Sequence, residues 1–161
     1  MLEIRLATPD DHTAISVLVV HTFGQPNEHK LVQALRTAGD VALEMVADDD
    51  GRIVGHICFS RFVTPEGWWA LAPMCVVHDR QGQGIGSEMV RYGLDHARQA
   101  KAKAVVVLGD PIYYKRFGFV FDGPATLETH YPKQYTGLFP LDPGTAAAEV
   151  ALRYPPSFEQ V

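Results

Sequence analysis

The most informative segment of the chain is Val76-Val77-His78-Asp79-Arg80-Gln81-Gly82-Gln83-Gly84-Ile85-Gly86-Ser87. An apolar run ends there, three glycines follow at alternate positions, and residues 88–100 then repeat apolar side chains with helical spacing. This order predicts a strand, a tight glycine loop and a helix. Such a loop directs backbone N–H groups at one point beside the positive end of the helix dipole. The segment therefore predicts a site for a diphosphate or another polyanion.

The spacing of the glycines excludes two common phosphate loops. A nucleotide P-loop needs Lys followed by Ser or Thr after its last glycine, and this chain has Ile85-Gly86-Ser87 there. A dinucleotide fingerprint has the order Gly-x-Gly-x-x-Gly after an early first strand. Here the glycines alternate, and the loop lies in the middle of the chain after several strand-like segments.

Length and composition describe an ordinary globular protein. With 161 residues and 20% charged side chains, residues 1–161 are expected to form a single domain. No apolar run approaches the length of a membrane span, and the start of the chain lacks a signal-peptide core, so we expect a cytoplasmic protein without a membrane partner. The net charge of −5 argues against nucleic acid as a partner and mildly favours cationic substrates.

The cysteines and histidines do not follow metal-site spacing. Cys58 and Cys75 stand alone, and none of the seven histidines forms a His-x-x-x-His pair, so no metal site is expected. The two cysteines lie nearly symmetrically about the Glu66-Gly67 turn, which leaves open that they are cross-strand neighbours. We expect both to be reduced core thiols.

The pattern of apolar residues predicts strands and helices in an α/β (α+β) order. The expected strands are residues 2–7, 41–47, 52–63, 68–77, 104–108, 119–121 and 146–153. The expected helices begin near Thr8, Asn27, Glu88 and Pro111. Residues 122–145 are rich in Pro, Gly, Tyr and Thr and are expected to form a long loop. The order predicts a mixed, mostly antiparallel central sheet with helices on both faces.

A second motif follows about thirty residues after the glycine loop, Ile112-Tyr113-Tyr114-Lys115-Arg116-Phe117-Gly118-Phe119. It resembles the aromatic-Tyr-x-x-aliphatic-Gly-Phe segment of GNAT-superfamily N-acyltransferases. Residues 81–86 of this chain also resemble the phosphate loop of that superfamily. The resemblance covers residues 2–121 by element order. Residues 71–76 and 109–114 further resemble a subgroup of small bacterial acetyltransferases. The resemblance implies the GNAT acyl-CoA N-acyltransferase fold.

The resemblance also implies roles for particular residues. Met74, Cys75 and Val76 match the strand that pairs with the pantetheine arm of acetyl-CoA. The pyrophosphate loop corresponds to Gln81, Gly82, Gln83, Gly84, Ile85, Gly86 and Ser87. Tyr114 matches the tyrosine that protonates the leaving thiolate, whereas Tyr113 is expected in the core. Pro73 cannot donate to a strand ladder, which makes it a suitable point for two strands to splay and admit pantetheine.

The chain departs from the family at two points. Residues 105–108 are all apolar, where many members carry a cofactor-binding Asn and a basic carboxylate. The general base is therefore unassigned. Glu28, Glu44 and Asp110 are candidates, although each is expected to be a surface charge, and Asp110 a helix cap. Arg80 and Lys115 are equally compatible with phosphate binding and with a solvated surface position.

Together these features imply an N-acetyltransferase that transfers acetyl from acetyl-CoA to a primary amine of a small molecule. Direct attack in a ternary complex would need no cysteine nucleophile. Three alternatives stay open: a protein N-terminus or lysine as acceptor, a non-catalytic acyl-CoA sensor, and assembly as a homodimer. We expect residues 122–145, with His21, Phe23 and Glu28, to wall the acceptor pocket. A structural loop is the competing interpretation.

Overall fold

The computed structural model describes residues 1–159. Its strands are β1 (Leu2–Leu6), β2 (Val41–Asp49), β3 (Arg52–Arg61), β4 (Trp68–Val76), β5 (Ala104–Leu108), β6 (Thr126–Glu128), β7 (Thr136–Pro140) and β8 (Glu149–Ala151). Its α-helices are α1 (His12–Phe23), α2 (Asn27–Ala38), α3 (Ile85–Gln99) and α4 (Pro111–Tyr114).

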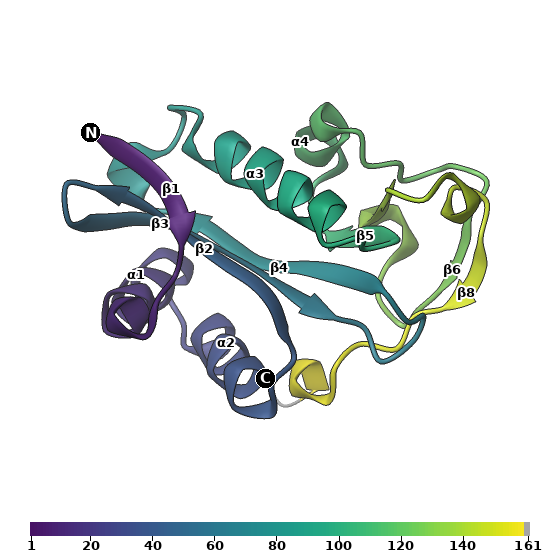
Figure 1. Ribbon diagram of the computed structural model, residues 1–161, viewed down its shortest axis with the longest axis horizontal. Helices are drawn as coiled ribbons and strands as arrows, with labels where there is room; N and C mark the ends of the chain where they lie inside the picture. The colour runs from purple at the N-terminus through teal and green to yellow at the C-terminus, as the bar shows by residue number, and fades with distance from the viewer. Residues whose placement is uncertain (160–161) are drawn as a thin grey trace.

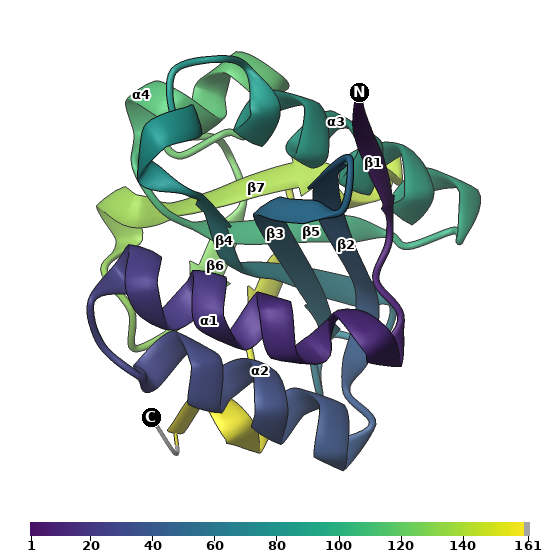
Figure 2. The ribbon, with the colours of Figure 1, turned by 90° about the vertical axis from the view of Figure 1, so that its left-hand side faces the viewer.

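The central sheet has the strand order β1-β2-β3-β4-β5-β7, and β6 pairs with β8 in a separate small sheet. Only the β4–β5 pairing in the central sheet is parallel. Helices α3 and α4 cover one face, and α1 and α2 cover the other (Figures 1 and 2). The expected α/β class, the mixed and mostly antiparallel sheet and the helices on both faces are confirmed.

Side chains that alternate along the strands contribute to a hydrophobic core on each face of the sheet. On β3, Ile57 and Phe59 face α3, while Cys58 belongs to a cluster with residues of α2. Gly93 allows α3 to approach the sheet closely, since a Cβ built there would come within 2.4 Å of Phe59. The buried face of α3 consists of Ile85, Met89, Val90, Gly93, Leu94 and Ala97.

Helix α3 begins earlier than expected. The sequence places its first residue near Glu88, but the structure starts it at Ile85, with Gly84 as N-cap at φ 84°. Gly86 therefore lies in the first turn of the helix, although glycine lowers helix propensity. The consequence is that the glycine loop and the helix N-terminus form one unit.

The C-terminal third differs most from the sequence prediction. Residues 119–121 form only an isolated bridge, Val120 to Leu138, and the last strand is restricted to Glu149–Ala151. Strand β7 lies inside the expected loop and pairs with β5. Its sequence, Thr-Gly-Leu-Phe-Pro, carries two residues that disfavour strands. The free edge of β5, rather than local propensity, selects this segment.

The two cysteines are free and buried. They are not paired across strands, because Cys75 lies opposite His56 and Cys58 lies opposite Glu44. The sequence symmetry about the Glu66-Gly67 turn fails at the register shift between Ile57 and Phe59.

Candidate active site

A cavity of about 570 Å³ opens where the glycine loop meets the end of β4 and the last turn of α1. Most of its lining was predicted as cofactor site: Met74, Cys75, Val76, Gln81, Gly82, Gly84, Ile85, Gly86 and Ser87. The remaining lining residues are Thr22, Phe23, His78, Arg80, Tyr113 and Arg116. Residues that are far apart in the sequence thus meet at the N-terminus of α3.

The glycine loop gives this cavity an anion-binding end. Gly82 and Gly84 adopt left-handed backbone angles, with φ of 77° and 84°. Residues with a side chain rarely adopt such φ angles, and a glycine at these positions leaves the backbone open to a ligand. The free N–H groups of the first turn of α3 and the positive end of its dipole lie at the same point.

Strands β4 and β5 part beside the cavity. Their parallel pairing runs from Trp68–Ala104 to Leu71–Val107 and includes no residue of β4 beyond Leu71. Met74 to Val76 continue to pair with β3 on their other side. The edge of these three residues that faces β5 is therefore without a strand partner and can pair with an extended ligand, although the Val76 carbonyl already accepts a hydrogen bond from Gln81 Nε2 at 2.9 Å. The separation begins just before Pro73, where the sequence predicts it.

Two arginines bring positive charge to the cavity. Arg80 lines it and is held by Asp49 at 2.7 Å and by Gln83 Oε1 at 3.0 Å. Gln83 thus supports the loop from outside and does not line the cavity. Arg116 also lines the cavity, bonds Ser87 Oγ, and lies over the Tyr113 ring at 4.6 Å. Among residues 1–159 Arg116 has no carboxylate partner, so its charge is available to an anion.

The structure separates the two adjacent tyrosines. Tyr113 lines the cavity, and its hydroxyl lies against Gly86 of the loop. Tyr114, the predicted proton donor, is 9% exposed and packs against Tyr113, Phe117 and Phe119 without lining the cavity. Burial raises the pKa of Tyr114, so its phenol stays protonated at neutral pH.

With this geometry established, the chain can be compared with known proteins. The model of the acetyltransferase (GNAT) family matches residues 8–119. The chain belongs to the GNAT acetyltransferase family. The expectation of an acyltransferase is thereby confirmed.

Named GNAT relatives match over most of the chain. Uncharacterized N-acetyltransferase YhbS of Escherichia coli (strain K12) is 37% identical over 134 residues, 80% of each chain. The crystal structure of E. coli YhbS in complex with CoA superposes with a TM-score of 0.91 at 32% identity, covering 98% of this chain and 92% of that one. The crystal structure of a GNAT acetyltransferase from Brucella melitensis in complex with acetyl-CoA superposes with a TM-score of 0.85 at 32% identity, covering 98% of both chains.

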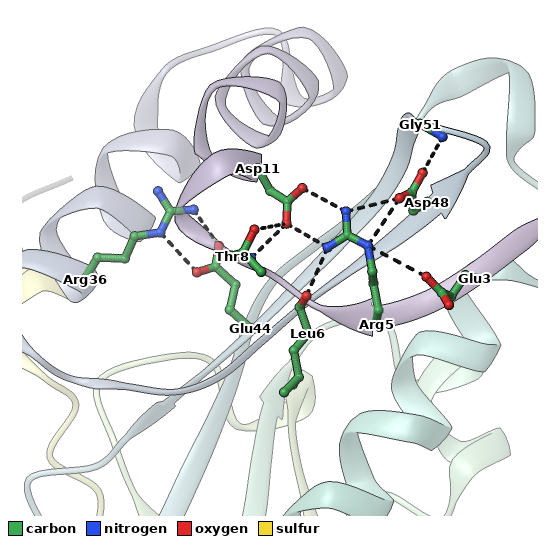
Figure 3. Close-up of polar contacts among 9 residues, drawn as sticks. All are labelled: Glu3, Arg5, Leu6, Thr8, Asp11, Arg36, Glu44, Asp48 and Gly51. Atoms are coloured by element: carbon green, nitrogen blue, oxygen red, sulfur yellow. Dashed lines mark hydrogen bonds and ion pairs between the residues drawn. The ribbon is translucent and has the colours of Figure 1, made fainter.

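The carboxylates of this GNAT domain do not all behave as expected. Asp110 caps α4 by accepting from the Ile112 N–H at 2.9 Å, as predicted. Glu44 is not a surface charge, because its side chain is 9% exposed. It accepts two hydrogen bonds from Arg36 and lies 2.7 Å from His56 Nε2. Figure 3 shows the hydrogen bonds from Arg36 to Glu44. It also shows a separate cluster in which Arg5 donates two hydrogen bonds to Asp11.

Protonation states follow from these contacts. Burial by itself would raise the pKa of Glu44, but the hydrogen bonds from His56 and Arg36 lower it to about 2. Burial raises the pKa of the Cys75 thiol to about 12, so the thiol that lines the cavity stays protonated. A protonated thiol is a poor nucleophile, which agrees with the expected direct transfer without a cysteine intermediate.

The expected acceptor walls do not meet in one cavity. The segment after α4 encloses its own apolar cavity of about 260 Å³, lined from Val120 to Ala146 and including Leu127, Lys133 and Leu138. No residue of α1 or α2 lines that cavity, and no residue of 122–145 lines the one at the glycine loop. Thr22 and Phe23 do reach the glycine-loop cavity from the end of α1.

Sequence reasoning missed Thr22, His78, Tyr113 and Arg116 as cavity residues. Arg116 lies inside the second motif next to another basic residue, Lys115. The sequence does not show which of the two side chains faces the loop. Within residues 1–159, no group of three His, Cys, Asp or Glu side chains could hold a metal ion. Across the same range, no helix is both long and apolar enough to cross a bilayer.

Proposed function

We propose that this protein transfers an acetyl group from acetyl-CoA to a primary amine of a small molecule, by direct attack in a ternary complex. The observation that carries the proposal is the cavity that joins the glycine loop to the open edge of β4. An anion-binding end followed by an unpaired strand edge complements the two parts of CoA, its pyrophosphate and its amide-containing arm.

The relatives support this cofactor. Two structures that are 32% identical to this chain and cover nearly all of it hold CoA or acetyl-CoA. In this chain Gly82, Gly84 and the first turn of α3 would bind the pyrophosphate. Arg116 would add a charge-assisted contact, since guanidinium groups match phosphate oxygens. Met74 to Val76 would pair with the pantetheine arm.

The reaction then needs two proton transfers and one stabilised oxyanion. A neutral amine attacks the thioester carbon, and the backbone near Met74 stabilises the resulting oxyanion. We propose Tyr114 as the acid that protonates the departing thiolate. Its phenol is protonated at neutral pH, and the raised pKa makes it a weaker acid than an exposed tyrosine. The hydroxyl of Tyr113 lies at the pyrophosphate end, which favours cofactor binding for that residue.

The acceptor that we propose is a small cationic amine, which would approach from the end of α1. Thr22 and Phe23, at the end of α1, and Cys75, on β4, line the same cavity as the loop. The net charge of −5 favours a cationic acceptor.

Thiol release from acetyl-CoA across a panel of small amines, peptides with free N-termini and lysine peptides tests the proposal. We expect turnover with small amines. Turnover with peptides alone would reassign the acceptor to protein. Tight acetyl-CoA binding in calorimetry with no thiol release from any amine would contradict an enzyme and favour an acyl-CoA sensor.

A further inference from the structure

A buried histidine, His56, lies on β3 opposite Cys75, one of the residues that line the cavity. His56 is 0% exposed and lies in the middle of β3. Its Nε2 is 2.7 Å from Glu44 Oε2, and Glu44 is held in turn by Arg36 from α2. The three side chains form a chain of contacts that links β3, β2 and α2.

The carboxylate determines which ring nitrogen carries the proton. An ionised carboxylate only accepts hydrogen bonds, so Nε2 must donate to Glu44. In the neutral imidazole this leaves Nδ1 as an unprotonated acceptor. Nδ1 is buried and has no hydrogen-bond partner among residues 1–159. A buried acceptor without a donor is costly, and such groups call for an explanation in function or in a missing partner.

The register of the sheet places His56 next to a residue of the cavity wall, although His56 itself is not among the lining residues. His56 on β3 lies directly opposite Cys75 on β4, and Cys75 lines the cavity at the open edge of β4. Side chains of opposed residues point to the same face, with Cβ atoms typically about 5 Å apart. Thr22 reaches the same cavity from α1.

The surroundings of His56 contain few other titratable groups. Glu44 faces it from β2, Arg36 from α2, and Cys75 from β4, while Cys58 follows it on the same face of β3. Glu28, at the start of α2, is the further acidic group that acts on Cys75. Helix α1 covers this part of the sheet with Ile15, Leu18 and Val19, which carry no charge. Glu44 is thus the carboxylate in direct contact with His56.

We propose that His56 is the general base of the acetyl transfer, with Glu44 as its positioning residue; this inference rests on the proposed function. Nδ1 takes one proton from the ammonium form of the acceptor, which leaves a neutral amine. Glu44 holds the ring through Nε2–H and stabilises the imidazolium that results. The amine then attacks the thioester carbon and forms the C–N bond, the C–S bond breaks, and the thiolate receives its proton from Tyr114. The proton that the nitrogen loses as it becomes the amide restores the phenol of Tyr114. His56 returns its proton to solvent when the products leave.

His56→Gln is the sharpest test, because it separates the two nitrogens. A glutamine amide can reproduce the Nε2–H bond to Glu44 and so keep a purely structural role, but it has no basic nitrogen. We expect kcat/KM to fall on the order of 10²-fold or more. We also expect the pH dependence of kcat/KM to change on its acidic side. The pH dependence that remains should then report only the ionisation of the acceptor amine. The CoA dissociation constant should stay within about twofold of the wild-type value.

A matched control comes from the same strand. Ser60 is 0% exposed, and its hydroxyl also lacks a partner among residues 1–159, but it lies opposite Ala70, which does not line the cavity, whereas His56 lies opposite the lining residue Cys75. Ser60→Ala should keep the wild-type rate and pH profile. Wild-type kinetics and an unchanged profile in a folded His56→Gln variant would overturn the inference alone. No turnover by the wild type with any amine would overturn the proposed function and the inference together.

Glu44→Gln gives a second, independent measurement should His56→Gln fail to fold. Removing the carboxylate removes the charge that stabilises the imidazolium. The acidic limb of kcat/KM should therefore move to lower pH, with CoA affinity unchanged. A limb that stays in place would overturn the role of His56 as base.

Discussion

The hydroxyl of Tyr113 lies directly against Gly86. A Cβ built on Gly86 would come within 2.8 Å of Tyr113 Oη, a distance that real Cβ atoms do not adopt. The second motif thus contacts the glycine loop through one phenol. The absence of a side chain at position 86 is what allows α4 to close over the first turn of α3.

This contact predicts a coupled pair of substitutions. Gly86→Ala should raise the CoA dissociation constant about tenfold, because the new methyl displaces Tyr113 into the cavity. Tyr113→Phe removes the oxygen that clashes, so Gly86→Ala should cost clearly less in that background. Calorimetric titration of the four proteins of this cycle measures the coupling. Strictly additive effects would show that the phenol does not limit the loop.

Gly84→Ala tests whether the glycine loop binds CoA, and Gly39→Ala is its control because Gly39 has a similar φ angle. Gly84 and Gly39 have φ of 84° and 76°, and neither has an atom within 4 Å of a built Cβ. Alanine at either position should therefore cost about 1–2 kcal/mol of stability. Only Gly84→Ala should also weaken CoA binding, since a Cβ there projects into the site. Equal CoA affinity in the two variants would contradict the loop assignment.

The two tyrosines are expected to separate binding from chemistry. Tyr114→Phe keeps the ring and removes the proton, so kcat should fall on the order of 10²-fold while CoA affinity persists. Tyr113→Phe should raise the CoA dissociation constant and leave kcat at saturation nearly unchanged. Steady-state kinetics with calorimetry distinguish these outcomes. The reverse pattern would move the acid to Tyr113, the residue that lines the cavity.

The largely enclosed carboxylate of Glu44 predicts an acid-dependent loss of stability. Its pKa in the folded protein is about 2, below the usual value near 4.5, so folding favours the charged form. This stabilisation, on the order of 3 kcal/mol, is complete above about pH 4.5 and is lost as the pH falls toward 2. Urea unfolding at pH 6, 4 and 3 measures it. Glu44→Gln should flatten that dependence, and an equally steep curve in the variant would assign the acid sensitivity to other carboxylates.

The close approach of α3 to the sheet is also testable. Gly93→Ala would place a methyl 2.4 Å from the Phe59 ring, inside a packed core. Overpacking of this kind costs about 1–3 kcal/mol. Asp95→Ala, on the exposed face of the same helix, is the control and should change the unfolding free energy by less than about 0.5 kcal/mol. Equal midpoints in urea would mean that the core can adjust to the extra methyl.

The sequence by itself determined the parts of the protein that local chemistry dictates. Alternating glycines before a helical repeat predicted the tight loop, since residues with a side chain rarely adopt the positive φ angles of Gly82 and Gly84. The residues at Gly109-Asp110-Pro111 fixed the start of α4, because an aspartate cap and a proline at the first helical position act within one turn. The order of elements predicted the sheet and its two helical layers.

Other features were decided only by the tertiary structure. Thr136–Pro140 became a strand because the edge of β5 offered it hydrogen bonds, which local propensity does not record. Glu44 became a buried ion because Arg36 and His56 arrive from other elements to hold it. The register of β3 against β4 placed His56 opposite Cys75. Such contacts join residues far apart in the chain, and the strand pairing that brings them together is not encoded in any single segment.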